Sequence, residues 1–127
     1  MAMERIDEVN DRLRLIQKTD GLTFGTDALL LASYVNTANA EGCELGGGTG
    51  IISMLLLTRD KLKETVALEV QAEYARLIRR NAELNSLSDR IETRNIDLRE
   101  YKSGEIFDIV YTNPPYMTAS GGASNTV

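Results

Sequence analysis

The sequence predicts an α/β fold, a doubly wound Rossmann-like parallel sheet. Strand-like and helix-periodic segments alternate along the 127 residues. The strand-like runs at residues 66–68 and 106–110 are short and apolar, as is typical of parallel strands that are covered on both faces. A glycine-rich segment, residues 46–50, lies where an earlier strand, at about residues 41–45, should turn into a helix. Alternation in this order implies a parallel sheet with right-handed crossovers.

The first elements are expected before the alternation begins. Leu13 and Leu15 on one side, and Leu22 and Phe24 on the other, flank an Asp-Gly turn signal at residues 19–21 and predict a small hairpin. A short helix should follow, starting near Thr26. The predicted order then continues as a strand at about 41–45, the glycine loop at 46–50, a helix at about 50–58, a strand at 65–69, a helix at 71–86, and strands at 91–95 and 106–111.

The predicted helix at 71–86 has one apolar face, with Ala75, Ile78 and Ala82 at helical intervals. The net charge of −5 does not indicate a nucleic-acid-binding surface over the whole chain. The basic residues nevertheless form two clusters, Arg12, Arg14 and Lys18, and Arg76, Arg79 and Arg80. Each cluster is either a solvated face or a contact for phosphate groups.

Length and composition favour a single domain over residues 1–127, with residues 118–127 as a mobile tail of small polar residues. The longest apolar stretch, residues 51–57, is too short to cross a bilayer, so no membrane partner is expected. A single cysteine, Cys43, and the absence of histidine predict neither an internal disulfide nor a zinc site. A reducing cytoplasm fits this composition best.

The glycine loop carries the first candidate site residues. Gly46, Gly48 and Gly50 allow positive φ and let the backbone approach a ligand closely. Their spacing lacks the last glycine of the dinucleotide fingerprint. Glu44 precedes them and would repel a pyrophosphate, but it suits a cationic ligand such as S-adenosylmethionine. The loop therefore favours that cofactor over a dinucleotide.

Two further acids follow the next strands. Glu69 ends the second strand, where a carboxylate can accept hydrogen bonds from both hydroxyls of a ribose. Asp97 follows the third strand and could lie beside an adenine amino group. The alternatives are a surface acid at a strand end for Glu69 and an Asx-turn for Asp97.

The most informative stretch is Asn113-Pro114-Pro115-Tyr116, directly after a fourth strand and at the same edge as the glycine loop. The two prolines fix the backbone, so a rigid turn is one interpretation. The other is catalytic. The Asn113 side-chain oxygen and the Pro114 carbonyl can accept hydrogen bonds from an amino group and so favour a localised lone pair. The Tyr116 ring can stack on a flipped-out base.

This combination resembles class I S-adenosylmethionine-dependent methyltransferases of the amino-group type. Residues 44–50, Glu69, Asp97 and residues 113–116 look like the family's first four motifs. Residues 13–32 are similar to a segment of bacterial tRNA adenine-N6 methyltransferases, which modify an adenosine beside the anticodon of a valine tRNA. The resemblance implies S-adenosylmethionine as cofactor, tRNA as substrate and methyl transfer to an exocyclic amino nitrogen.

Three departures from this family stand out. Glu44 stands where aspartate is commoner, and the loop has three consecutive glycines. Family members also continue past the fourth motif with further strands, in the order 3-2-1-4-5-7-6 of a seven-stranded sheet. We therefore expect a fragment, with its strand at 106–111 as an exposed edge that joins another copy or the missing half.

Three other functions stay open. A release-factor glutamine-N5 methyltransferase uses the same Asn-Pro-Pro-Tyr element, although its upstream Pro-Arg-Pro-Asp-Thr-Glu signature is absent here. DNA adenine methyltransferases normally carry a separate target-recognition region. A truncated domain could also bind cofactor or RNA without catalysing any reaction.

Overall fold

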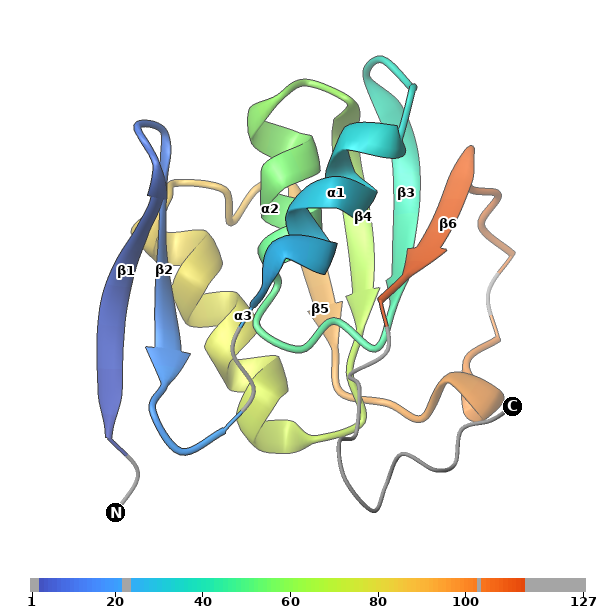
Figure 1. Cartoon of the computed structure of the whole chain (residues 1–127). Helices are drawn as coiled ribbons and strands as arrows, with labels where there is room; N and C mark the ends of the chain where they lie inside the picture. Colours follow the sequence, from blue (N-terminus) through green and yellow to red (C-terminus); the bar gives the residue numbers. More distant parts are fainter. Residues whose placement is uncertain (1–2, 22–23, 103, 114–127) are drawn as a thin grey trace.

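The computed structural model describes residues 3–21, 24–102 and 104–113. Four parallel strands form one sheet, with three helices on one face and a two-stranded hairpin beside them (Figure 1). The strands are β3 (Ala40–Leu45), β4 (Leu62–Leu68), β5 (Ile91–Arg94) and β6 (Ile109–Thr112), in the sheet order β5-β4-β3-β6. This is the 3-2-1-4 order that the resemblance implies, and the doubly wound Rossmann-like class is confirmed.

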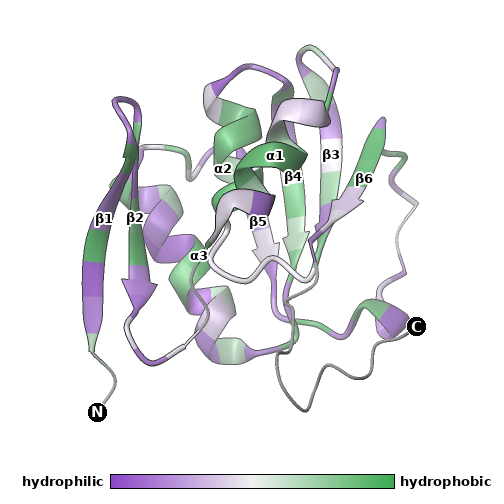
Figure 2. Ribbon diagram, in the orientation of Figure 1, coloured by the Kyte–Doolittle hydropathy of each residue, from purple (hydrophilic) through white to green (hydrophobic). Residues whose placement is uncertain are grey.

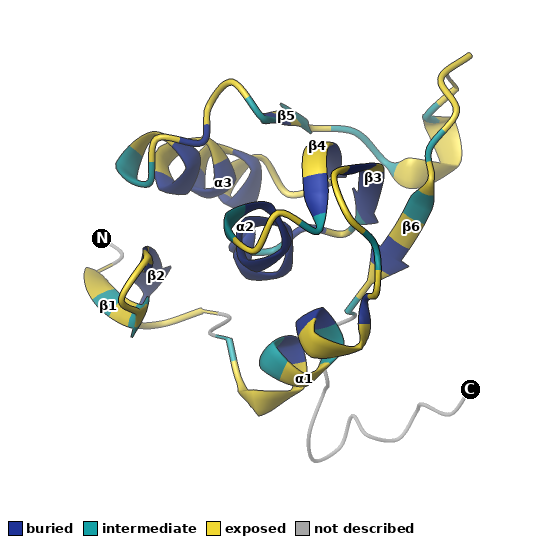
Figure 3. Ribbon diagram, turned by 90° about the horizontal axis from the view of Figure 1, so that it is seen from above, coloured by how far each residue is buried: buried dark blue, intermediate teal, exposed yellow. Residues whose placement is uncertain are grey.

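The helices α1 (Thr26–Tyr34), α2 (Ile51–Thr58) and α3 (Ala72–Leu84) lie on the same side of the sheet (Figure 3). The central helix α2 is almost wholly buried and apolar (Figure 2), because it packs against β4, β2 and α1. As predicted, Ala75, Ile78 and Ala82 of α3 face the core. Burial of these faces supplies the main stabilisation of the fold.

The predicted hairpin, with its turn at residues 19–21, was wrong, because the hairpin lies earlier in the sequence. The structure pairs β1 (Glu4–Asn10) with β2 (Leu13–Lys18), and the chain reverses at Asp11 and Arg12. The Asn10 side chain accepts the Arg12 N–H at 2.8 Å, an Asx-turn that fixes this reversal. The Asp-Gly signal at residues 20–21 does mark a turn, but it leads the chain out of β2 toward α1.

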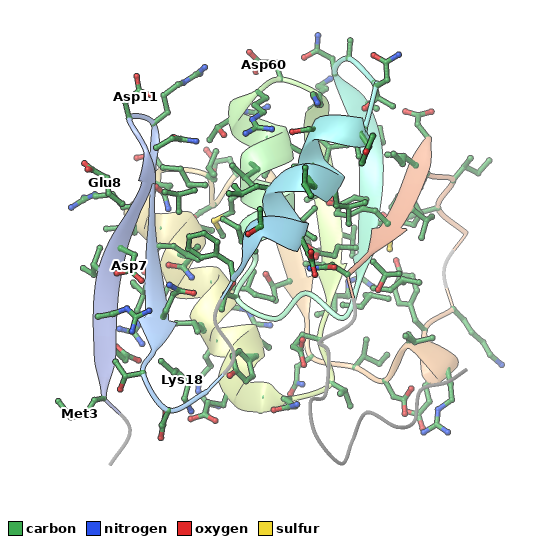
Figure 4. All side chains as sticks on the ribbon, in the orientation of Figure 1. Met3, Asp7, Glu8, Asp11, Lys18 and Asp60 are labelled. Carbon is green, nitrogen blue, oxygen red and sulfur yellow. The ribbon has the colours of Figure 1, made fainter. Side chains whose placement is uncertain are left out.

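Ion pairs fasten the hairpin to α3. The Arg80 guanidinium binds the Glu4 carboxylate through two hydrogen bonds of 2.6 and 2.9 Å. Lys18, at the end of β2 (Figure 4), pairs with Glu73 in the first turn of α3. Lys18 of the first basic cluster and Arg80 of the second therefore each form an ion pair within the fold.

The last strand starts later than predicted, at Ile109, and runs to Thr112. Asp108 ends the preceding segment by exchanging hydrogen bonds with the Glu41 backbone, and Ile106 is 90% exposed. Among the described residues β6 pairs with β3 alone, and Val110 on it is 55% exposed. The predicted tail at 118–127 lies outside the described residues.

Across the described part of the chain, no helix combines the length and apolar character that a membrane span requires.

Candidate cofactor site

The glycine loop joins β3 to α2 at the carboxyl edge of the sheet. Gly46, Gly48 and Gly50 have φ values of 71°, 58° and 88°, in the left-handed region that glycine tolerates best. The Gly46 N–H donates to the Leu68 carbonyl at 2.8 Å, which holds the loop against the end of β4. A Cβ placed on Gly46 or Gly48 would meet no atom within 4 Å, so the backbone there is open to a ligand.

Glu69 follows β4 and is 6% exposed. One of its carboxylate oxygens accepts the Gly48 N–H at 2.8 Å, and the other accepts the Gln71 N–H at 2.9 Å. Glu69 therefore joins the glycine loop to the start of α3. Each oxygen keeps a second acceptor position.

Asp97 borders a hollow of about 320 Å³ beside the loop. Its lining residues are Gly46, Leu68, Val70, Ile96, Asp97, Leu98 and Arg99. The Asp97 carboxylate accepts the Arg99 N–H at 2.9 Å and pairs with the Arg99 guanidinium, which lowers the pKa of Asp97 to about 2. The Asx-turn is thus present, and it places an ionised acid at the rim of an apolar hollow.

Glu44 lies beneath the loop and is only 2% exposed. Its carboxyl accepts the Ser53 hydroxyl at 2.5 Å, and Ser53 is 2.8 Å from the Tyr111 hydroxyl, which is 2.7 Å from the Thr65 hydroxyl. This buried series of hydrogen bonds connects β3, α2, β6 and β4. Burial raises the pKa of Glu44 to about 8, so the group is largely neutral at pH 7 in the absence of a nearby cation.

The strand pairing brings Asn113 to the same edge. Thr112 lies opposite Leu45 in the register of β6 with β3, and its hydroxyl donates to the Leu45 carbonyl at 2.8 Å. Asn113 therefore follows β6 where Gly46 follows β3, and its side chain is partly exposed. Pro114 and Tyr116 lie outside the described residues.

Three residues of the site were not predicted: Ser53, Thr65 and Tyr111. Ser53 is the one polar residue in the apolar run 51–57, and this interruption was a usable signal because a buried hydroxyl needs a hydrogen-bond partner. Thr65 and Tyr111 look like ordinary strand residues in the sequence. Their pairing depends on the register of β4 and β6 with β3.

Comparison with known proteins identifies the family. The sequence pattern of the methyltransferase small domain family matches residues 18–127. The chain belongs to this family. The family match includes the glycine loop, Glu69, Asp97 and residues 113–116.

Two curated relatives of this family member are each named tRNA1(Val) (adenine(37)-N6)-methyltransferase. The one from Glaesserella parasuis is 33% identical over 105 residues, which cover 82% of this chain and 45% of the relative. The one from Bacteroides thetaiotaomicron is 33% identical over 101 residues, covering 78% and 43%. The chain thus spans less than half the length of these relatives.

A solved structure with a similar fold is M. jannaschii TYW2 in complex with AdoMet. Its TM-score with this chain is 0.73 at 16% sequence identity, over 84% of this chain and 49% of that one. At this identity the likeness concerns the fold alone.

Proposed function

We propose that this chain is the cofactor-binding part of an S-adenosylmethionine-dependent methyltransferase that modifies the exocyclic amino group of adenine in tRNA. The observation that carries the proposal is the juxtaposition, in a member of the methyltransferase small domain family, of an open glycine loop, Glu69 and Asn113 at one sheet edge. Ligands of open α/β sheets bind at this edge.

The residues fit the cofactor. The uncovered backbone at Gly46 and Gly48 leaves room for the methionine part. The free acceptor positions of Glu69 suit the two ribose hydroxyls, and the apolar hollow suits the adenine, with Asp97 at its rim for the amino group. Glu44 becomes ionised more readily when a cation lies above it. When bound, the cofactor supplies an electrophilic methyl group on a sulfonium sulfur.

The catalytic roles fall to Asn113, Pro114 and Tyr116. The Asn113 side-chain oxygen and the Pro114 carbonyl accept hydrogen bonds from the target amino group and hold its lone pair in line with the methyl carbon. With the cofactor held by the glycine loop and Glu69, its methyl group would be accepted by this nitrogen, and the methylated amine would lose its proton to water. Asn113 is neutral, so it orients the amine and does not abstract the proton. Tyr116 stacks on the extruded base.

The names of the curated relatives favour tRNA over the other substrates. A cytoplasmic location follows from that substrate. The edge of β6, with Val110 55% exposed, would pair with a further strand from a second copy or from the remainder of a longer protein. The net charge of −5 is unfavourable for binding tRNA, so such an addition would also supply phosphate contacts.

The substrate is tested by methyl transfer from S-adenosylmethionine labelled in its methyl group. Bulk tRNA, a peptide release factor and double-stranded DNA are offered in parallel, and the labelled product is hydrolysed and identified. We expect label in tRNA as N6-methyladenosine, at a low rate for this chain by itself. Label in a release-factor glutamine or in DNA would show that this molecule, and not tRNA, is the substrate. Binding of S-adenosylhomocysteine with no transfer to any substrate would indicate a domain that binds the cofactor without turnover.

A further inference from the structure

Asn81 lies in the last turn of α3 and is completely buried. Its side-chain oxygen accepts the Ile16 N–H at 2.6 Å. Its amide nitrogen donates to the Ile16 carbonyl at 3.1 Å and to the Thr49 carbonyl at 3.0 Å. Two carbonyls face the nitrogen and one N–H faces the oxygen, so only one orientation of the amide satisfies all three groups.

Asn85, one helical turn further on, makes the matching pair of bonds to β2. Its side chain accepts the Arg14 N–H at 3.0 Å and donates to the Arg14 carbonyl at 2.7 Å. Four residues of a helix rise about 6 Å. Two residues of a strand rise about 6.8 Å, close to the same spacing. The two asparagines therefore pair α3 with the second edge of β2, much as another strand would.

Asn81 makes one bond that Asn85 lacks, the bond to the Thr49 carbonyl of the glycine loop, whereas the third bond of Asn85 goes to the Asn81 backbone carbonyl at 2.8 Å within the helix. Thr49 is 5% exposed and immediately precedes Gly50, from which α2 starts. The other side of the loop is held by the Leu68 carbonyl and by Glu69. The bond from Asn81 thus fixes the half of the loop that leads into α2. If this bond is lost, the buried Thr49 carbonyl loses a hydrogen-bond partner, which raises the free energy of this loop conformation.

We propose that Asn81 is a positioning residue for the cofactor, holding the glycine loop in its binding conformation and coupling that loop to β2. This inference rests on the proposed cofactor site. The Asn81 side-chain amide makes hydrogen bonds to both Ile16 and Thr49. Coupling between two sites is reciprocal, so a ligand that orders the loop also strengthens the hydrogen bonds of Asn81 to Ile16.

The matched variants Asn81→Asp and Asn85→Asp test the proposal. Each aspartate keeps the shape of the side chain and its acceptor oxygen but replaces the N–H donors with a second acceptor. Affinity for S-adenosylhomocysteine is measured by calorimetry, and the melting temperature of each variant is recorded. We expect about a tenfold loss of affinity for Asn81→Asp and less than about a twofold loss for Asn85→Asp. Equal affinities of the two variants, with both folded, would overturn the positioning role.

A second measurement on the unchanged chain covers the case in which Asn81→Asp does not fold. Backbone amide exchange is followed by NMR with and without saturating S-adenosylhomocysteine. We expect the ligand to slow exchange of the Ile16 amide more than that of Arg14. Protection of Gly48 and Gly50 with no greater protection at Ile16 than at Arg14 would show that Asn81 does not couple the two segments.

The two proposals fail in different ways. If the unchanged chain binds no S-adenosylhomocysteine, the proposed cofactor site is wrong and the role of Asn81 is wrong with it. If the chain binds the ligand with the same affinity after either asparagine substitution, only the role of Asn81 is wrong.

Discussion

Asn113→Ala is expected to lower kcat for tRNA methylation by about 100-fold or more, the scale seen when one preorganised hydrogen-bonding group is removed from a reacting centre. The side chain acts on the methyl acceptor and mainly in the transition state, so affinity for S-adenosylhomocysteine should stay nearly unchanged. Single-turnover methyl transfer and calorimetry measure the two quantities separately.

The matched control is Asn36→Ala. Asn36 is an exposed asparagine in the connection before β3, at the opposite end of that strand from the glycine loop. Its substitution should leave the rate unchanged. If Asn113→Ala retained a near-normal rate, residues 113–116 would be a structural turn and the proposed catalysis would be wrong.

Tyr116→Phe should lower the rate of tRNA methylation only mildly, because stacking requires the ring and not the hydroxyl.

Glu44→Gln is expected to change how stability depends on pH. The pKa of Glu44 is about 8 in the folded chain against 4.5 ordinarily, because burial disfavours the charged form. Below pH 4.5 the carboxyl is neutral in both states, and its full contribution to stability is present. As the pH rises from 4.5 to 8, the unfolded chain releases this proton and the folded chain keeps it. The free energy of unfolding therefore falls, by about 1.4 kcal/mol for each unit of pKa shift that is realised.

Urea unfolding of the ligand-free chain at pH 5, 6, 7 and 8 measures this effect. The sequence has no histidine, so few other side chains titrate in this window. The difference between the unchanged chain and Glu44→Gln isolates the contribution of Glu44, and the variant should gain relative stability as the pH rises. A difference that is constant from pH 5 to pH 8 would show that Glu44 ionises normally in the fold.

The sheet and its helices were predictable because their signals are local. Apolar periodicity places α3, and the Gly46-to-Gly50 segment marks the turn from β3 into α2. The hairpin was misplaced because β1 is a mostly charged strand without a buried face of its own, and its turn depends on the Asn10 side chain. An Asp-Gly pair was the stronger signal, but it ends β2 instead of linking two strands.

The site was predictable only where chain position determines it. Glu69 and Asn113 follow strands, so parallel topology brings them to one edge. The partners of Glu44 and Asn81 depend on tertiary packing across elements far apart in the sequence. Asn81 is one of several polar residues in an amphipathic helix, and only its burial separates it from the solvated ones.

Calorimetric titration with S-adenosylhomocysteine tests the proposed cofactor site most directly, with Glu69→Ala and Glu92→Ala measured beside the unchanged chain. Glu92 is an exposed acid on β5 that pairs with Arg94, and its loss should leave the affinity unchanged. We expect Glu69→Ala to weaken binding by about 1–3 kcal/mol, because the ribose hydroxyls and the Gly48 N–H lose their acceptor. Equal affinities for all three proteins would contradict the placement of the cofactor on Glu69 and the glycine loop.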